Sequence, residues 1–373
     1  MKAPSSSRLV ELDSLRGIAA LIVVVHHAYL SLPEVPDWVA WTVNDTPLRP
    51  IGMGRQAVIF FFVLSGYVLT RALARQEERQ PGSVLSGSGW VHYGAQRAIR
   101  LGLPVLAAVL FSALMQSVSW SGPLPPETPH ITGGATWAVP WTWQDLAAQA
   151  LLLKHGDGFQ LDPVLWSLVH EWRVALLLPL ALLFRGQLAL LVAVALVGAG
   201  IARLAGMPEG HVSLGESLAG TFAASAGFLP AFAAGAALAL RQVPRLDDVQ
   251  ARAAGVVIVV MAMAAHDYGV IAGSVLLILL AQRGGTFARG LRRPSLLWLG
   301  KVSFSLYLVH LPVLLMLTHL LHDQTAPGVV AVMAMLLALP AAAAMHALVE
   351  RPAHRLARSL PAPRGGRLHA RLS

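Results

Sequence analysis

The chain has 373 residues, of which 55% are hydrophobic and only 13% are charged. A soluble domain carries about 25% charged residues, so the composition excludes an ordinary soluble protein and indicates an integral membrane protein. The chain has no cysteine, which excludes disulfides, thiolate nucleophiles and zinc–thiolate sites.

Ten segments are apolar enough to be expected as membrane-spanning helices, which need about 20 residues each. They are 14–32, 52–70, 101–120, 163–184, 187–205, 217–240, 253–266, 268–282, 302–321 and 327–349. The apolar segment 146–155 is too short to span and predicts an interfacial or re-entrant helix. No small-residue cleavage site follows the polar start of the chain, so we expect no cleavable signal peptide. The predicted fold is an all-α integral membrane protein with about ten transmembrane helices.

The formal net charge of +9 would indicate nucleic-acid binding in a soluble protein. If the N-terminus is cytoplasmic, these spans place nearly all Lys and Arg residues in cytoplasmic segments or at their edges, as the positive-inside rule requires. The exceptions are Arg49, Arg55, Lys154, Arg173 and Arg203. We therefore expect both termini to be cytoplasmic and no nucleic-acid partner. The basic tail 353–373 is expected to be disordered and to lie against anionic lipid.

Two loops, 33–50 and 121–145, are then expected outside. The tryptophans in these loops and at their edge are Trp38, Trp41, Trp120, Trp137, Trp141 and Trp143. Tryptophans of this kind form either an interfacial aromatic belt or a rim that stacks on sugar rings. The sequence leaves both readings open.

The first span carries a charge and two imidazoles. Residues on a helix advance 100° and 1.5 Å each, so Arg16 and His27 share one face, roughly 16 Å apart, whereas His26 is turned about 100° away. Ionisable groups inside a span usually face a cavity or a partner. We expect Arg16 at the cytoplasmic mouth and His27 deeper on the same face. The alternative is that His27 is a buried histidine bonded to a neighbouring helix.

A second candidate is Glu171 in the span 163–184, about 12 Å from its outer end and near the expected depth of His27. A carboxylate there would orient an imidazole. The alternative is a structural ion pair with Arg173 or another cation. Val174 occupies the position of the second histidine in H-E-x-x-H, so that metal motif fails, and we expect no metal.

Two further segments carry polar residues. Ser65–Gly66 lies in an aromatic-rich span, where glycine permits close approach of a helix or ligand. No G-x-S-x-G motif surrounds Ser65, which argues against a hydrolase nucleophile. Arg97 and Arg100 share one face at an expected cytoplasmic helix start, where arginines suit phosphate. Anionic lipid is the alternative ligand.

Six segments occur together in a recognisable order. They are ELDSLRGIAALIVVVHHA from residue 11, FFVLSGYVL from 61, RAIRLGLP from 97, WSLVHEW from 166, GKVSFSLYLVHLPV from 300 and VERP from 349. With these motifs the chain resembles the acyltransferase 3 family of multi-span membrane acyltransferases. Ile59 departs from an aspartate that many relatives carry, and His170 and Arg173 occupy variable positions. These departures concern which acceptor is used and not the type of reaction.

The resemblance implies roles for individual residues. The family spacing of arginine, ten residues and histidine makes His27 catalytic and gives Arg16 a part in holding the acyl donor. Glu171 is assigned to orient or polarise His27, and Ser65, Arg97 and Arg100 are assigned to acyl-CoA binding. Trp166, Tyr307 and His310 occupy family motif positions as substrate or structural residues.

The predicted protein is therefore an O-acyltransferase in the bacterial cytoplasmic (inner) membrane, with its domain over residues 1–352. It would move an acyl group, acetyl by default, from cytoplasmic acyl-CoA as co-substrate to a carbohydrate hydroxyl, with no permanently bound cofactor. His27 would act as general base or as covalent acyl carrier. The alternative is a secondary transporter with an intramembrane proton relay, which predicts inverted repeats; none is seen in the sequence.

Overall fold

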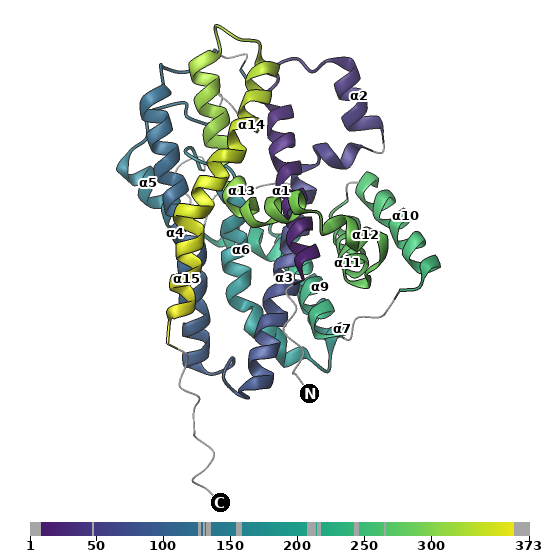
Figure 1. Ribbon diagram of the computed structural model, residues 1–373. Coiled ribbons are helices and arrows are strands. Elements are labelled where there is room, and N and C mark those ends of the chain that lie inside the picture. Colours follow the sequence, from purple (N-terminus) through teal and green to yellow (C-terminus); the bar gives the residue numbers. More distant parts are fainter. Residues whose placement is uncertain are drawn as a thin grey trace, which may run out of the picture.

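The computed structural model describes residues 9–46, 48–125, 128–129, 131, 136–153, 159–206, 214, 218–241, 246–264 and 266–361. The regular elements of these residues are all helical (Figure 1). Lys154 and the tail from residue 362 onward, both named in the sequence predictions, lie outside the described residues.

The helices follow one another in chain order. They are α1 (Val10–Leu30), α2 (Asp37–Asp45), η1 (Arg49–Gly52), α3 (Gly54–Arg79), α4 (Gly87–Ser119), α5 (Trp143–Ala150), α6 (Leu165–Leu177), η3 (Leu178–Phe184), α7 (Leu188–Leu204), α8 (Leu218–Gly227), α9 (Leu229–Leu240), α10 (Asp248–Ala264), α11 (Asp267–Arg283), α12 (Gly285–Leu291), α13 (Pro294–Leu321), α14 (Pro327–Met345), η4 (His346–Glu350) and α15 (Arg351–Ser359).

Each of the ten expected spans coincides with a helix or a pair of helices, but the number ten is not confirmed. Five helical stretches in the described chain are long and apolar enough to span: Gly54–Arg79, Gly87–Ser119, Leu165–Phe184, Pro294–Leu321 and Pro327–Ser359. The total rises to seven if two bent pairs, α8–α9 and α11–α12, each count as one span. Helix α1 has 21 residues, but polar side chains interrupt its apolar run. The described part of the chain thus has five to seven helical stretches that are long and apolar enough to span, as expected of a helical membrane protein.

Helix α1 packs along α13 through two glycines. A Cβ atom on Gly17 would lie 2.6 Å from the backbone nitrogen of Gly300, so the two backbones touch there. His27 meets His310 at the same offset of 283 residues, which shows that the helices run parallel. The intervening positions follow the 3-4 spacing of a coiled-coil seam. That seam is Gly17, Ala20, Val24 and His27 on α1 with Gly300, Ser303, Tyr307 and His310 on α13.

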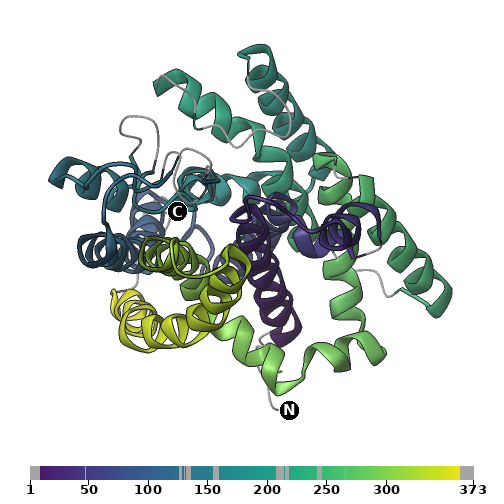
Figure 2. The same ribbon diagram turned by 90° about the horizontal axis from the view of Figure 1, so that it is seen from above.

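Helix α3 packs just as closely on α9. A side chain on Gly66 would collide with the backbone of Phe232, and one on Gly235 would collide with the backbone of Val63. The close approach expected at Ser65–Gly66 is therefore made by a helix. Figure 2 shows α1 near the centre, with α4, α14 and α15 to one side and α7 and α10 to the other.

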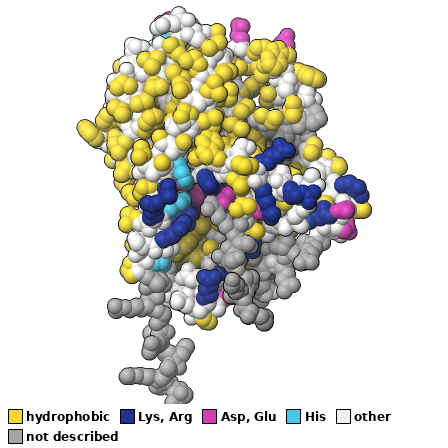
Figure 3. Space-filling view, viewed as in Figure 1, with side chains coloured by type: hydrophobic (Ala, Val, Ile, Leu, Met, Phe, Trp, Pro, Cys, Tyr) yellow, Lys and Arg dark blue, Asp and Glu magenta, His cyan; other side chains and the backbone are white. Residues whose placement is uncertain are grey.

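The tail expected to be disordered from residue 353 is helical as far as Ser359. Because the chain continues from α14 through a π-helical turn, η4, into α15 without a break, its apolar Ala353 and Ala357 pack into the protein. We call the side where α1 begins and α15 ends the terminal side, and the side of α2 the distal side. Figure 3 shows Lys and Arg gathered toward the terminal side, below a broad hydrophobic surface.

Candidate functional site

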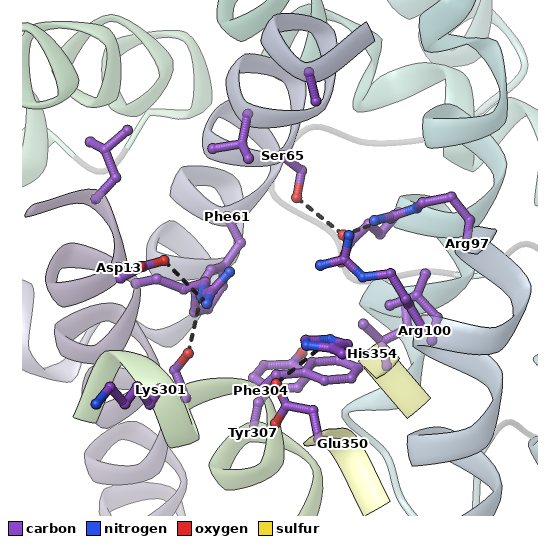
Figure 4. Close-up of a pocket in the computed structure, with 18 of the residues that line it drawn as sticks. Asp13, Phe61, Ser65, Arg97, Arg100, Lys301, Phe304, Tyr307, Glu350 and His354 are labelled. Atoms are coloured by element: carbon purple, nitrogen blue, oxygen red, sulfur yellow. Dashed lines mark hydrogen bonds and ion pairs between the residues drawn. The ribbon is translucent and has the colours of Figure 1, made fainter. Parts of the chain in front are cut away.

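A cavity of about 1000 Å³ extends inward from the terminal side. Its walls come from α1, α3, α4, α6, α13 and the C-terminal helices (Figure 4). The basic residues in its lining are Arg16, Arg71, Arg75, Arg97, Arg100, Lys301, Arg351, Arg355 and Arg358, and the acidic ones are Asp13, Glu171 and Glu350. A cavity with this charge balance concentrates anions, so it suits a polyanionic ligand.

Glu171 lies in the cavity wall and binds two neighbours through one oxygen. Its Oε1 accepts from Arg97 Nη2 at 3.1 Å and from Ser65 Oγ at 3.1 Å. The cation that pairs with it is thus Arg97. Arg173 instead donates to the carbonyl of Thr221. The hydrogen bonds between described side chains therefore do not connect Glu171 to His27, contrary to the expected contact.

The two arginines of α4 both face the cavity, as their spacing predicts, but they differ in burial and in ion pairing. Because α4 begins at Gly87, both lie more than two turns inside the helix and not at its start. Arg97 is buried and engaged by Glu171. Arg100 makes no hydrogen bond or ion pair with any described residue and extends into the cavity (Figure 4). Arg100 is therefore the one available to an anionic ligand.

Arg16 also lines the cavity and is held against α13. Its Nε donates to Ser303 Oγ at 3.1 Å and its Nη2 to the carbonyl of Gly300 at 3.4 Å. A longer contact of 3.5 Å joins Nη2 to Asp13. The guanidinium is thereby fixed at the wall, one side toward the cavity.

His27 lies farther along the same seam and contacts His310. Its Nδ1 is 2.8 Å from His310 Nε2, and the two rings stack at 5.1 Å with an interplanar angle of 16°. His27 thus shares the α13-facing side of α1 with Arg16, as the helical spacing predicts. It also bonds a histidine of a neighbouring helix, which the sequence analysis gave as the alternative.

The hydrogen bonds of the pair assign its protons. His310 Nδ1 lies 3.1 Å from the carbonyl of Leu306, and because a carbonyl only accepts, this nitrogen carries hydrogen. In a neutral ring His310 Nε2 is then an acceptor, so it takes its hydrogen bond from His27 Nδ1–H. His27 Nε2 is left with a free lone pair, the form needed for a base or a nucleophile.

His26 is satisfied elsewhere. Its Nδ1 is 2.5 Å from the carbonyl of Gly52, and its ring lies against Gly54, where a Cβ atom would collide with it. The adjacent histidines, whose ring centres are 5.5 Å apart, therefore have different hydrogen-bond partners: His26 bonds the backbone before α3 and His27 bonds α13.

Tyr307 and Trp166, both predicted as substrate or structural residues, lie in different places. The hydroxyl of Tyr307 is at the deep end of the cavity, 2.6 Å from Ser167 Oγ and 3.1 Å from the carbonyl of Val164. Trp166 is not among the cavity-lining residues and packs near Phe228 and His170.

A cluster on η4 and α15 is a part of the site to which the sequence reasoning gave no role. Glu350 Oε2 accepts from Ser305 Oγ at 2.7 Å and lies 3.0 Å from His346 Nδ1. His354 is 4.0 Å from the other carboxylate oxygen. Single π-helical turns occur often at functional sites. The sequence signal for this cluster would have been the two histidines that lie four residues before and four residues after the glutamate of VERP.

Two comparisons with known proteins give a match. A family model described as an acyltransferase domain matches residues 9–346. The O-acetyltransferase PaAT-1 of Phomopsis amygdali is 29% identical over 206 residues, covering 45% of this chain and 38% of that protein. The match therefore spans well under half of the relative's length. No solved structure matches the chain.

Proposed function

The chain belongs to the acyltransferase 3 family, and we propose that it transfers an acetyl group from cytoplasmic acetyl-CoA to a hydroxyl group of a carbohydrate. The observation that carries this proposal is the free lone pair on His27 Nε2, held by His310 beside a deep cationic cavity. The relative's name describes an O-acetyltransferase, which supports the same type of reaction.

The donor would enter from the terminal side, which we place at the cytoplasm. Coenzyme A carries several phosphate charges, and arginines bind phosphate in a bidentate way. Six cavity-lining cations make no hydrogen bond or ion pair with the described residues: Arg75, Arg100, Lys301, Arg351, Arg355 and Arg358. These are the proposed phosphate ligands. Arg16, fixed deeper in the wall, would hold the arm of the donor.

The chemistry needs one proton carrier. His27 Nε2 takes the proton of the acceptor hydroxyl while its oxygen attacks the thioester carbonyl. The carbon–sulfur bond then breaks, and the thiolate takes the proton back from His27, so the reaction gives an ester and free thiol with no net proton change. Transfer through an acyl-histidine is the other route. Release of coenzyme A before any acceptor is added would favour that second route.

The acceptor would arrive from the distal side. The exposed rings there include Trp38, Trp41 and Trp143, which offer flat faces to a sugar. Trp137 is buried and bonds the carbonyl of Leu161, so its ring supports the loop instead. We propose an exported polysaccharide or lipid-linked sugar as acceptor and the bacterial cytoplasmic membrane as the location.

The test measures coenzyme A release from acetyl-CoA by the purified chain with a carbohydrate acceptor. His27→Ala should lower the rate by about 10²–10⁴-fold, the usual worth of a general base. His26→Ala is the matched control, because it removes the adjacent imidazole. Wild-type turnover in His27→Ala would contradict the role of His27, and flux of a solute without thioester cleavage would favour a transporter.

A further inference from the structure

One carboxylate in the cavity wall lacks the kind of partner that the other two have. Asp13 contacts Arg16, and Glu171 is paired with Arg97. Glu350 forms no ion pair with a Lys or Arg among the described residues, although nine such residues line the same cavity. Ionisable groups inside a span usually face a cavity or a partner, so this carboxylate is a candidate for contact with a ligand.

The two oxygens of Glu350 differ in their hydrogen bonds. Oε2 accepts from Ser305 Oγ at 2.7 Å and from His346 Nδ1 at 3.0 Å, which fixes the carboxylate against α13. Oε1 accepts no hydrogen bond from a described residue, because His354 Nε2 is 4.0 Å away, too far for one. Oε1 is also not among the buried polar atoms that lack a partner. It is therefore open to the cavity and can accept a hydrogen bond from a ligand.

Glu350 lies inward of the charged mouth of the cavity (Figure 4). Its partner Ser305 is two residues before Tyr307, whose hydroxyl is at the deep end. Arg355 and Arg358 follow Glu350 on α15 toward the terminal side and also line the cavity. Helix rise places Arg358 roughly 12 Å farther out. A ligand whose charged part binds these arginines would therefore place a more inward part beside Glu350.

The proposed donor has its parts in the same order. Coenzyme A carries its phosphates at one end of an uncharged arm, which bears amide N–H groups before it reaches the sulfur. A carboxylate oxygen repels phosphate but accepts from N–H, and charge-assisted hydrogen bonds of this kind are the stronger ones. With the phosphates at the mouth and the thioester directed toward His27, the arm is the part that passes Glu350.

We propose that Glu350 Oε1 binds an amide N–H of the donor's arm. The proposal rests on the proposed acyl transfer and gives the cavity a second recognition element, which selects an amide-containing arm behind a phosphorylated head. A hydrogen bond to a charged group changes affinity about 10–100-fold. The phosphates alone should therefore bind without help from Glu350, whereas the whole donor should need it.

The experiment measures binding of two ligands to the purified full chain by calorimetry. They are coenzyme A and adenosine 3′,5′-bisphosphate, which has phosphates but no arm. Glu350→Ala should raise the Kd for coenzyme A about 10–100-fold. It should leave the Kd for the bisphosphate unchanged or lower, because a repelling charge is removed. Arg358→Gln is the contrasting control and should weaken both ligands, because Arg358 is a proposed phosphate ligand.

Two further variants separate ligand binding from a structural role of Glu350. Glu350→Gln keeps an acceptor oxygen and should weaken coenzyme A binding by less than Glu350→Ala does, and it carries the test if Glu350→Ala does not fold. Ser305→Ala removes the hydrogen bond that fixes Oε2 and leaves Oε1 in place, so it too should cost less.

Three results would overturn the proposal and leave the proposed function intact. They are a loss of coenzyme A affinity in Ser305→Ala as large as that in Glu350→Ala, an equal weakening of both ligands by the Glu350 variants, and unchanged or tighter coenzyme A binding in those variants. If the wild-type chain binds no coenzyme A, the proposed function itself fails.

Discussion

The cationic cavity and the histidine pair lie on the same helices, α1 and α13, but they are built in opposite ways. The cavity holds about 1000 Å³ and has cations with no partner among the described residues. The two imidazoles instead bond each other, and their hydrogen bonds leave one ring nitrogen free. Loosely held charges suit binding of a flexible anion, while a fixed imidazole suits proton transfer. Substitutions in the two regions should therefore separate into effects on KM and effects on kcat.

After the loss of His27 itself, the largest effect is expected at His310. His310→Ala removes the acceptor of His27 Nδ1–H and should lower kcat about 100-fold, with KM for acetyl-CoA nearly unchanged. His310→Gln offers an amide oxygen to the same N–H and should recover part of the loss. Steady-state kinetics of both variants check this, and equal losses in the two would argue against a hydrogen-bonding role.

Next comes the glycine contact below the pair. Gly300→Ala forces α1 and α13 apart and should cost about 1–3 kcal/mol of unfolding free energy, and a displacement of about 1 Å at His27 should lower kcat about tenfold to 100-fold. The control is Gly102→Ala on α4, whose added Cβ meets nothing within 4 Å. Thermal unfolding and kcat are measured together, and matching behaviour of the two variants would refute the contact's importance.

A smaller effect is expected at Arg100. Because it has no partner among the described residues, Arg100→Gln should raise KM for acetyl-CoA about tenfold and leave kcat and stability unchanged. Arg97→Gln is the comparison, because it removes the cation that pairs with the partly buried Glu171 and should destabilise the fold by about 1–3 kcal/mol. Kinetics and thermal unfolding distinguish them, and a stability loss in Arg100→Gln would contradict the assignment.

The smallest effect is expected at His26. His26→Ala loses one hydrogen bond to Gly52, worth about 1 kcal/mol, and should keep more than about a tenth of wild-type activity. A coenzyme A release assay measures it. A loss as large as that of His27→Ala would mean that the neighbouring imidazoles act together.

Local geometry was predictable from the sequence, because helical periodicity decides which residues of one helix share a face. This periodicity put Arg16 and His27 on one face of their helix, and Arg97 and Arg100 on one face of theirs. Each of the ten apolar segments also coincides with a helix or a pair of helices. Their count as spans did not follow, because hydropathy cannot show that α11 turns by 93° into α12 at Gly284 and Gly285, both of which have positive φ.

Contacts between distant segments were not predictable in the same way. His310 follows His27 by 283 residues, and no local rule selects it over Glu171 as the partner. Depth alone suggested Glu171, which instead meets Arg97 across 74 residues. The helical run to Ser359 was missed because its basic residues resemble a solvated tail, although Ala353 and Ala357 recur at helical spacing.

Because α1 is one continuous helix packed parallel to α13, it fixes the distance between the charged cavity wall and the histidine pair. Eleven residues separate Arg16 from His27, so the span between the charged wall and the base is fixed at roughly 16 Å by helix rise alone. Inserting one residue between them would rotate the imidazole by about 100° and remove it from His310. Inserting seven would restore its face but lengthen the reach by about 10 Å, so the proposed donor would bind normally while its thioester lay too far from the proposed base.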